Sequence, residues 1–212
     1  MAYKIDGPNT VELLDYSGGD LSHARAAWAS TGKEVTWEQR VRIPSLLQFL
    51  AENRHGTPFE HSLLSFKIKS DIATHIHCLK HRAGVSINSE SARYKELNDD
   101  SVYIPADWPD KLQQEAHEHF SESIVKYHTV LQKLVDSGMD RRRAKETARF
   151  YLPYAHQISY VMTFNFRSFV HFQNLRSAKD AQMEIQEIAR QMLGIVQDLG
   201  TFDHSLKAHG LH

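Results

Sequence analysis

Cationic and hydrogen-bonding side chains gather in the segment 80–93, which reads KHRAGVSINSESAR. Only Val85 and Ile87 could contribute large apolar side chains to a core from this segment. Burial of the remaining charges without partners would be too costly. The segment is therefore either a solvated loop or the lining of a site that binds a polyanionic ligand.

Two further clusters place cations among apolar side chains. Arg149 lies in the segment ARFYLP (148–153). The segment FNFRSFVHFQNLR (164–176) carries Arg167, His171 and Arg176, whose spacing puts them roughly on one face of a helix. An arginine in an apolar helix usually has an anionic partner, which is either a core carboxylate or a phosphate.

Composition limits the class of protein and its partners. The chain has 212 residues, of which 41% are hydrophobic, and this suits one domain over residues 1–212. The net charge of -1 attracts neither nucleic acid nor an anionic membrane, so an anion site must be built locally. The single cysteine, Cys78, excludes an intrachain disulfide and fits a reducing cytoplasm. No apolar run approaches the ~18 residues of a membrane span, so we expect a cytoplasmic protein.

Hydrophobic periodicity predicts an α+β fold with helix in the majority. Strands are expected at 9–16, 62–70 and 158–164. In the second of these, Leu64, Phe66 and Ile68 alternate with polar residues and should point inward.

Helical spacing is found in most of the remaining chain. One helix should cover 36–53 with Phe49 buried and with Pro44 marking a start or a kink. Another should run from a cap at Asp71 to His81. Further helices are expected after Asp20 and over 111–136, 140–151, 165–176 and 180–199.

The order and spacing of four blocks resemble the flavin-dependent thymidylate synthases. The blocks are TPFEH (57–61), KHRAGVSINSESAR (80–93), ARFYLP (148–153), and NFRSFVHFQNLR (165–176) followed by AQMEIQ (181–186). The family hallmark is Arg-His-Arg followed by Ser-x-Arg. Here Lys80 replaces the first arginine, and the spacer to Ser91 is one residue longer than in the commoner form.

The resemblance implies a methyltransferase that converts dUMP to dTMP. The carbon would come from 5,10-methylenetetrahydrofolate and the hydride from FAD reduced by NADPH. It also implies a single domain with a small, mainly antiparallel sheet and several long helices. The flavin sites would be assembled from several subunits of a homotetramer.

The same resemblance assigns individual residues, and Arg176 takes the catalytic role, because a cation beside the uracil ring favours its activation. Either Ser89 or Glu90 fills the family's carboxylate position. The flavin set is His55, Thr57, Lys80, His81, Arg82, Glu90, Asn165, Arg167 and His171. The dUMP set is His77, Ser89, Glu90, Ser91, Arg93, Arg149 and Arg176.

Three other classes of protein fit the sequence less well. A zinc site would draw on His75, His77, Cys78 and His81, but His75 and His77 point about 200° apart on a helix. No metal is therefore expected. A nucleic-acid module would rest on the cationic run 141–143, which is more often a solvated face. A cysteine-dependent thymidylate synthase needs a Pro-Cys-His motif, and the setting of Cys78 excludes it.

Overall fold

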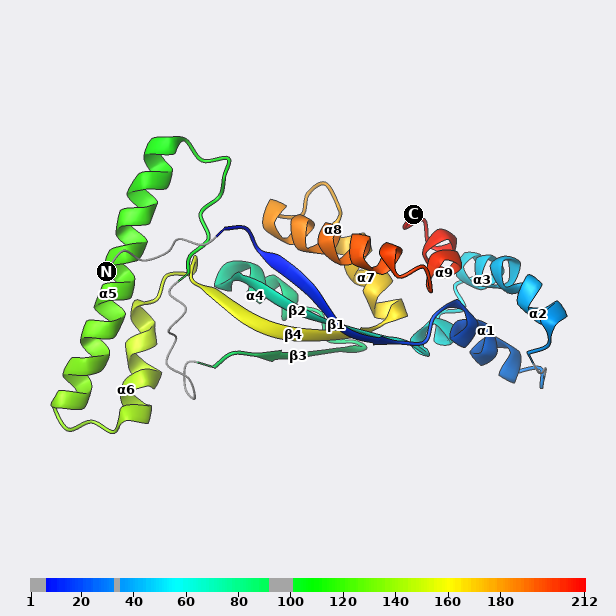
Figure 1. Cartoon of the computed structure of the whole chain (residues 1–212), viewed down its shortest axis with the longest axis horizontal. Coiled ribbons are helices and arrows are strands. Elements are labelled where there is room, and N and C mark those ends of the chain that lie inside the picture. The colour runs from blue at the N-terminus through cyan, green and yellow to red at the C-terminus, as the bar shows by residue number, and fades with distance from the viewer. Residues whose placement is uncertain (1–6, 33–34, 92–100) are drawn as a thin grey trace. The chain divides into compact units, whose positions relative to one another are not determined.

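The alternating segments 62–70 and 158–164 form the two central strands of a four-stranded antiparallel sheet (Figure 1). The computed structural model describes residues 7–32, 35–91 and 101–212, so Arg93 lies outside the described residues. The strand order is β1-β2-β4-β3, and Leu64, Phe66 and Ile68 are buried as predicted. The strands are β1 (Thr10–Ser17), β2 (Leu63–Asp71), β3 (Val85–Ser89) and β4 (Gln157–Asn165).

Contacts within the chain define two compact units, each made of three stretches of sequence. One comprises residues 1–9, 69–78 and 89–160, and we call it the α5 unit. The other comprises residues 10–68, 79–88 and 161–212, and we call it the α7 unit. Strands β2, β3 and β4 contribute residues to both units.

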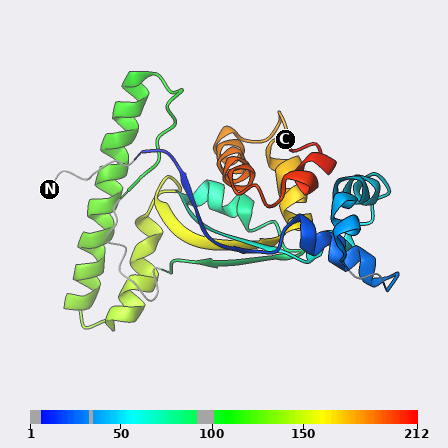
Figure 2. The ribbon, with the colours of Figure 1, turned by 45° about the vertical axis from the view of Figure 1, so that its right-hand side comes forward.

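A helical hairpin dominates the α5 unit, and its two helices lie side by side in both views (Figure 1, Figure 2). The hairpin turns at Gly138, where φ is +89°, and Asp140 caps the second helix by accepting two backbone N–H groups. Its core consists of Tyr127, Leu131, Ala144 and Ala148. The helices of this unit are α4 (Ile72–Cys78), α5 (Asp110–Asp136), α6 (Arg141–Ala148) and the short η2 (Arg149–Tyr151).

The α7 unit packs its helices around a core rich in phenylalanine. Helix α3 contacts α1 and α9, while α8 contacts α7 and β1. Phe166 and Phe202 stack with ring centroids 5.4 Å apart and so join α7 to the C-terminal segment. The helices are α1 (Asp20–Ala29), α2 (Trp37–Val41), α3 (Ile43–Glu52), η1 (Thr57–Glu60), α7 (Phe166–Arg176), α8 (Met183–Asp198) and α9 (Asp203–Ala208).

A buried chain of hydrogen bonds ties α1 to α9 in the α7 unit. His23 is fully buried, and its Nδ1 and Nε2 atoms each lie 2.8 Å from a hydroxyl, Ser205 Oγ and Ser62 Oγ respectively. Ser205 Oγ donates to the Asp20 carboxylate, which can only accept. Ser205 must therefore accept from His23 Nδ1–H, and His23 Nε2 must accept from Ser62. The direction of each hydrogen bond in the series Ser62–His23–Ser205–Asp20 is thus fixed.

Several predicted boundaries differ from the structure. The predicted helix 36–53 is broken at Arg42, because Pro44 lacks the N–H group that a continuous helix requires. Phe49 on α3 is 55% exposed, so the prediction that it is buried was wrong. Helix α4 ends at Cys78 and not at His81, since the chain turns and enters β3 after Gly84, where φ is +64°. Strand β3 itself was not predicted.

The prediction of an α+β fold with helix in the majority is confirmed. No helix in the described ranges is both long and apolar enough to cross a bilayer.

Candidate functional site

Ala83 and Gly84, which follow the Lys80-His81-Arg82 segment in the α7 unit, contact the N-terminus of α7. Asn165 caps α7 by accepting from the Ser168 N–H at 2.8 Å, and its own N–H donates to Gly84 O at 3.1 Å. Ser168 Oγ donates to Ala83 O at 2.8 Å. A Cβ atom at Gly84 would clash with the Asn165 and Ser168 side chains, so this close approach requires glycine.

His81 and Arg176 form a direct pair in the same unit. Arg176 Nε donates to His81 Nε2 at 2.8 Å, which places the imidazole proton on Nδ1. The pKa of His81 is lowered to about 4 by burial, then by the positive charge of Arg176, and then by His171. A neutral imidazole therefore orients the guanidinium group at neutral pH.

Arg167 is the second oriented arginine, and it already has an anionic partner. Its Nη1 atom lies 2.7 Å from Glu60 Oε1 across the contact between α7 and η1, and both side chains are exposed. A Cβ atom at Gly56 would lie 2.7 Å from Arg167 Nε, so the arginine crosses closely over this glycine. The sequence left a carboxylate or a phosphate as the anionic partner of an arginine in this helix, and in the structure Arg167 is paired with the carboxylate of Glu60.

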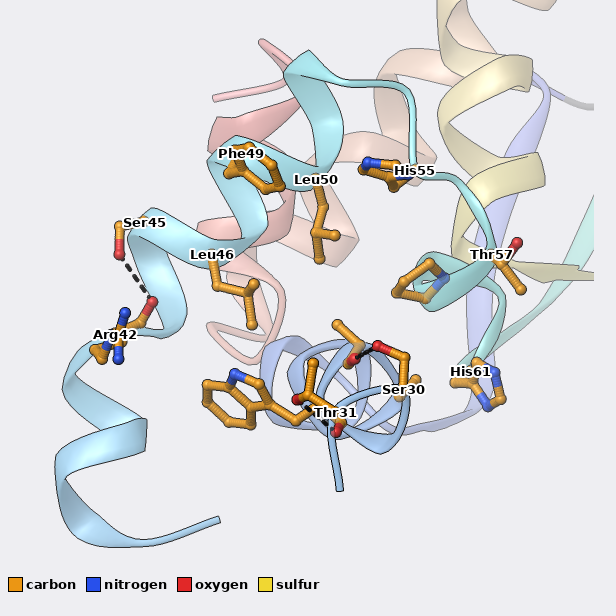
Figure 3. Close-up of a pocket in the computed structure, with 14 residues that line it drawn as sticks. Ser30, Thr31, Arg42, Ser45, Leu46, Phe49, Leu50, His55, Thr57 and His61 are labelled. Carbon is orange, nitrogen blue, oxygen red and sulfur yellow. Dashed lines mark hydrogen bonds between the residues drawn. The ribbon is translucent and has the colours of Figure 1, made fainter. Parts of the chain in front are cut away.

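A cavity of about 740 Å³ lies between α1, α3 and η1 of the α7 unit (Figure 3). His55 and Thr57, both predicted to bind flavin, line one side of it. Its other walls were not predicted, because Phe49 was assigned to the core from the sequence. These further lining residues include Trp28, Ser30, Thr31, Arg42, Leu46, Phe49 and His61.

Of the residues predicted to bind dUMP, Ser89, Glu90 and Ser91 lie in the α5 unit at the end of β3. Ser89 Oγ lies 2.8 Å from His75 Nε2. Glu90 is tied to β4: its N–H donates to Ser159 O at 2.9 Å, and its carboxylate accepts from Ser159 N–H at 3.0 Å. Ser91 follows, and it is half-buried.

Each predicted set of residues is largely confined to one unit. The α7 unit holds His55, Thr57, Lys80, His81, Arg82, Asn165, Arg167, His171 and Arg176. The α5 unit holds His77, Ser89, Glu90, Ser91 and Arg149. Arg176, assigned to dUMP, thus falls in the unit of the flavin set, while Glu90 falls in the α5 unit. Of the candidate zinc ligands, His75 and Cys78 instead contact Ser89 and Tyr160.

Comparison with known proteins shows which family the chain resembles. A family model for "Thymidylate synthase complementing protein" matches residues 12–199. The flavin-dependent thymidylate synthase of Thermosipho africanus is 32% identical over 98% of this chain and 95% of its own length. That of Thermotoga neapolitana is 34% identical over 84% of this chain and 81% of its own.

The fold is also similar to that of solved structures. PolB from Streptomyces cacaoi, a UMP/dUMP methylase bound with 5-Br UMP, superposes with a TM-score of 0.81 and 27% identity, over 100% of this chain and 98% of PolB. The chain thus shares its α+β fold with a UMP/dUMP methylase of known structure. The chain belongs to the family of flavin-dependent thymidylate synthases.

Proposed function

We propose that this protein methylates dUMP to dTMP, with 5,10-methylenetetrahydrofolate as the carbon donor and NADPH as the reductant of bound FAD. The observation that carries the proposal is the pairing of Arg176 with a neutral His81 in the Lys80-His81-Arg82 segment. The pair holds a guanidinium group in one orientation, and cations that could bind phosphate lie next to it in sequence.

The residues of the α7 unit fit FAD. Lys80, Arg82 and Arg167 are exposed cations suited to a pyrophosphate, and Gly56 permits the close approach of Arg167. The cavity beside His55 and Thr57 has aromatic walls that suit a planar ring. The other proposed flavin contacts are His81, Asn165, His171 and Glu90. Bound FAD would supply the hydride for the reaction.

Arg176 is proposed to stabilise negative charge on the pyrimidine. Uracil is a poor nucleophile at C5 until electron density enters its ring, and a fixed cation lowers the free energy of that anion. Because His81 is neutral, its hydrogen bond orients the Arg176 guanidinium group without adding a second charge.

The remaining proposed contacts bind dUMP and do not form covalent bonds. Ser91 is assigned a hydrogen bond to the nucleotide, because a serine nucleophile needs a nearby base and the adjacent cations cannot accept a proton. His77, Ser89, Glu90, Arg93 and Arg149 complete this set. The Ser91→Ala variant should bind dUMP more weakly and still form dTMP.

UMP is a second candidate substrate, because PolB is a UMP/dUMP methylase and covers this chain over its full length. Both nucleotides carry the same base and 5′-phosphate. Comparing kcat/KM for dUMP and UMP in one assay decides between them.

The test of the proposed function is reconstitution from defined components. Purified protein should be yellow, and acid should release FAD and not FMN. With dUMP, 5,10-methylenetetrahydrofolate and NADPH it should form dTMP, and omission of any one component should abolish the product in mass spectrometry. Colourless protein that FAD cannot reconstitute would reject the proposal.

We also propose that the active protein is a cytoplasmic homotetramer. Exposed aromatic side chains in the α5 unit support association, because Phe150 is 80% exposed and lies near Tyr151 and Tyr154 in sequence. Light scattering at micromolar concentration should give four times the mass of the chain. A monomer that still turns over would contradict this assembly.

A further inference from the structure

One buried histidine of the α5 unit lies outside every role assigned so far. His75 on α4 is only 8% exposed, and its Nε2 atom lies 2.8 Å from Ser89 Oγ at the end of β3. Ser89 is one of the residues proposed to bind dUMP. His75 therefore contacts the proposed substrate site through another side chain.

Neutral groups hold the imidazole of His75 in place. Its ring packs against that of Tyr160 with centroids 4.6 Å apart. Tyr160 is in turn anchored through its hydroxyl, which lies 3.1 Å from Ser70 Oγ and 3.3 Å from Cys78 Sγ. Burial lowers the pKa of His75 and raises that of Tyr160, so both rings are uncharged near neutral pH.

A hydrogen bond from a fixed ring restricts what Ser89 can offer a ligand. If the imidazole nitrogen accepts, the Ser89 oxygen presents its lone pairs to a ligand N–H group. If the nitrogen donates, Ser89 presents its O–H group to a ligand oxygen. Only in the first tautomer is the polarity of the hydroxyl fixed, because its single proton is used; in the second, Ser89 keeps its O–H group and one lone pair, and the hydrogen bond holds the position of its oxygen.

We propose that His75 is a positioning residue for the pyrimidine nucleotide, acting by fixing the Ser89 hydroxyl. This inference rests on the proposed function. It assigns one nucleotide contact at the end of β3 to a neutral His–Ser pair, next to the Glu90 carboxylate, one oxygen of which accepts from Ser159 N–H.

A double-mutant cycle on FAD-loaded protein tests this coupling, with dUMP binding measured by calorimetry. His75→Phe keeps a ring against Tyr160 and removes the hydrogen bond, while Ser89→Ala removes the hydroxyl. Each single variant should weaken dUMP binding about fivefold to tenfold, the effect of one hydrogen bond. The double variant should bind no more weakly than the weaker single variant, because the second change removes nothing further.

Two controls separate positioning from structural damage. His75→Gln retains a side chain that can bond Ser89, and it should bind dUMP within about twofold of the unaltered protein. Ser70→Ala leaves the His75–Ser89 hydrogen bond and the Cys78 contact of Tyr160 in place, so it should weaken dUMP binding less than His75→Phe does. FAD content should be the same in all variants. If His75→Phe does not fold, His75→Leu carries the same expectation.

Multiplicative effects of the two single changes would overturn the inference, as would normal dUMP binding by His75→Phe. Neither outcome bears on the proposed function. Failure of the unaltered FAD-loaded protein to bind dUMP would instead reject the proposed function itself, and the inference with it.

Discussion

At the scale of single residues, the two arginines of α7 differ in how they are held. Arg176 is bound by a neutral imidazole, and Arg167 by the Glu60 carboxylate. A neutral imidazole orients a guanidinium group without adding a charge, whereas a partner carboxylate must be exchanged for an anionic ligand. The His81 contact therefore orients Arg176, and the Glu60 contact is one that an anionic ligand of Arg167 would replace.

Replacement of Arg176 by alanine should separate catalysis from flavin binding. Loss of one charge-assisted contact in a dry site costs about 3 kcal/mol, or roughly a hundredfold in rate. We expect dTMP formation to fall by about that factor while the FAD absorbance of the purified protein is retained. Unchanged turnover would transfer the role to another cation.

Replacement of Gly56 by alanine should weaken FAD binding without unfolding the protein. The three atoms nearest to the new Cβ atom would all belong to the Arg167 side chain, which can move away but then leaves its present position. Gly194→Ala is the matched control, since its Cβ atom would meet nothing within 4 Å. A fluorescence titration with FAD should show weaker binding for Gly56→Ala alone. Equal affinities would mean that Arg167 does not need this position.

At the scale of elements, the candidate site depends on a side chain that caps a helix, Asn165, and on one that connects two helices, Asp20. Asn165 caps α7 with its carbonyl oxygen, so its amide group is what it can offer to flavin. Asp20, at the start of α1, accepts from the backbone N–H groups of His204 and Ser205 and from Ser205 Oγ. The C-terminal helix α9 is thereby fixed to α1, one of the helices that line the cavity.

Asp20→Asn should loosen α9. The change removes a charged acceptor shared by three donors, and the free energy of unfolding should fall by about 1–3 kcal/mol. Amide exchange in α9 should accelerate more than exchange in α8. Asp203→Asn is the control, because Asp203 begins α9 and is exposed. Equal exchange rates in the two variants would show that the Asp20 contacts do not hold the helix.

The sequence predicted the elements better than the contacts between them. The alternation of apolar and polar residues in 62–70 and the helical spacing of apolar residues over 111–136 are local signals. The strand and the helix that they predict are both present. Strand β3 was missed because its five residues are largely polar and its pairing with β4 is non-local. The His75–Ser89 and Arg176–His81 pairs join separate elements, and no spacing rule reports such contacts. The predicted roles of the site residues remain predictions.

At the scale of the whole molecule, buried neutral histidines make stability depend on pH. Burial lowers the pKa of His23 from 6.5 to about 3, with smaller contributions from His209 and His61. The unfolded chain binds a proton at this histidine near pH 6.5, while the folded chain does not until about pH 3. The stabilisation is therefore complete above pH 6.5 and is lost as the pH falls toward 3.

Urea unfolding at pH 7, 6 and 5 should detect this dependence. Below pH 6 the free energy of unfolding should fall by up to about 1.4 kcal/mol per pH unit for each such histidine. In His23→Gln the slope should be shallower, since one titrating group is gone. Stability that stays constant between pH 7 and pH 5 would contradict the burial of neutral histidine.

The fixed bond directions around His23 also have a spectroscopic consequence. Because Asp20 forces the imidazole proton onto Nδ1, the ring exists as one tautomer and does not titrate between pH 5 and 8. Its two ¹⁵N resonances should therefore be widely split and constant across that range. The chain contains 14 histidines, so His23 supplies an internal standard against which the protonation of the others can be followed by NMR.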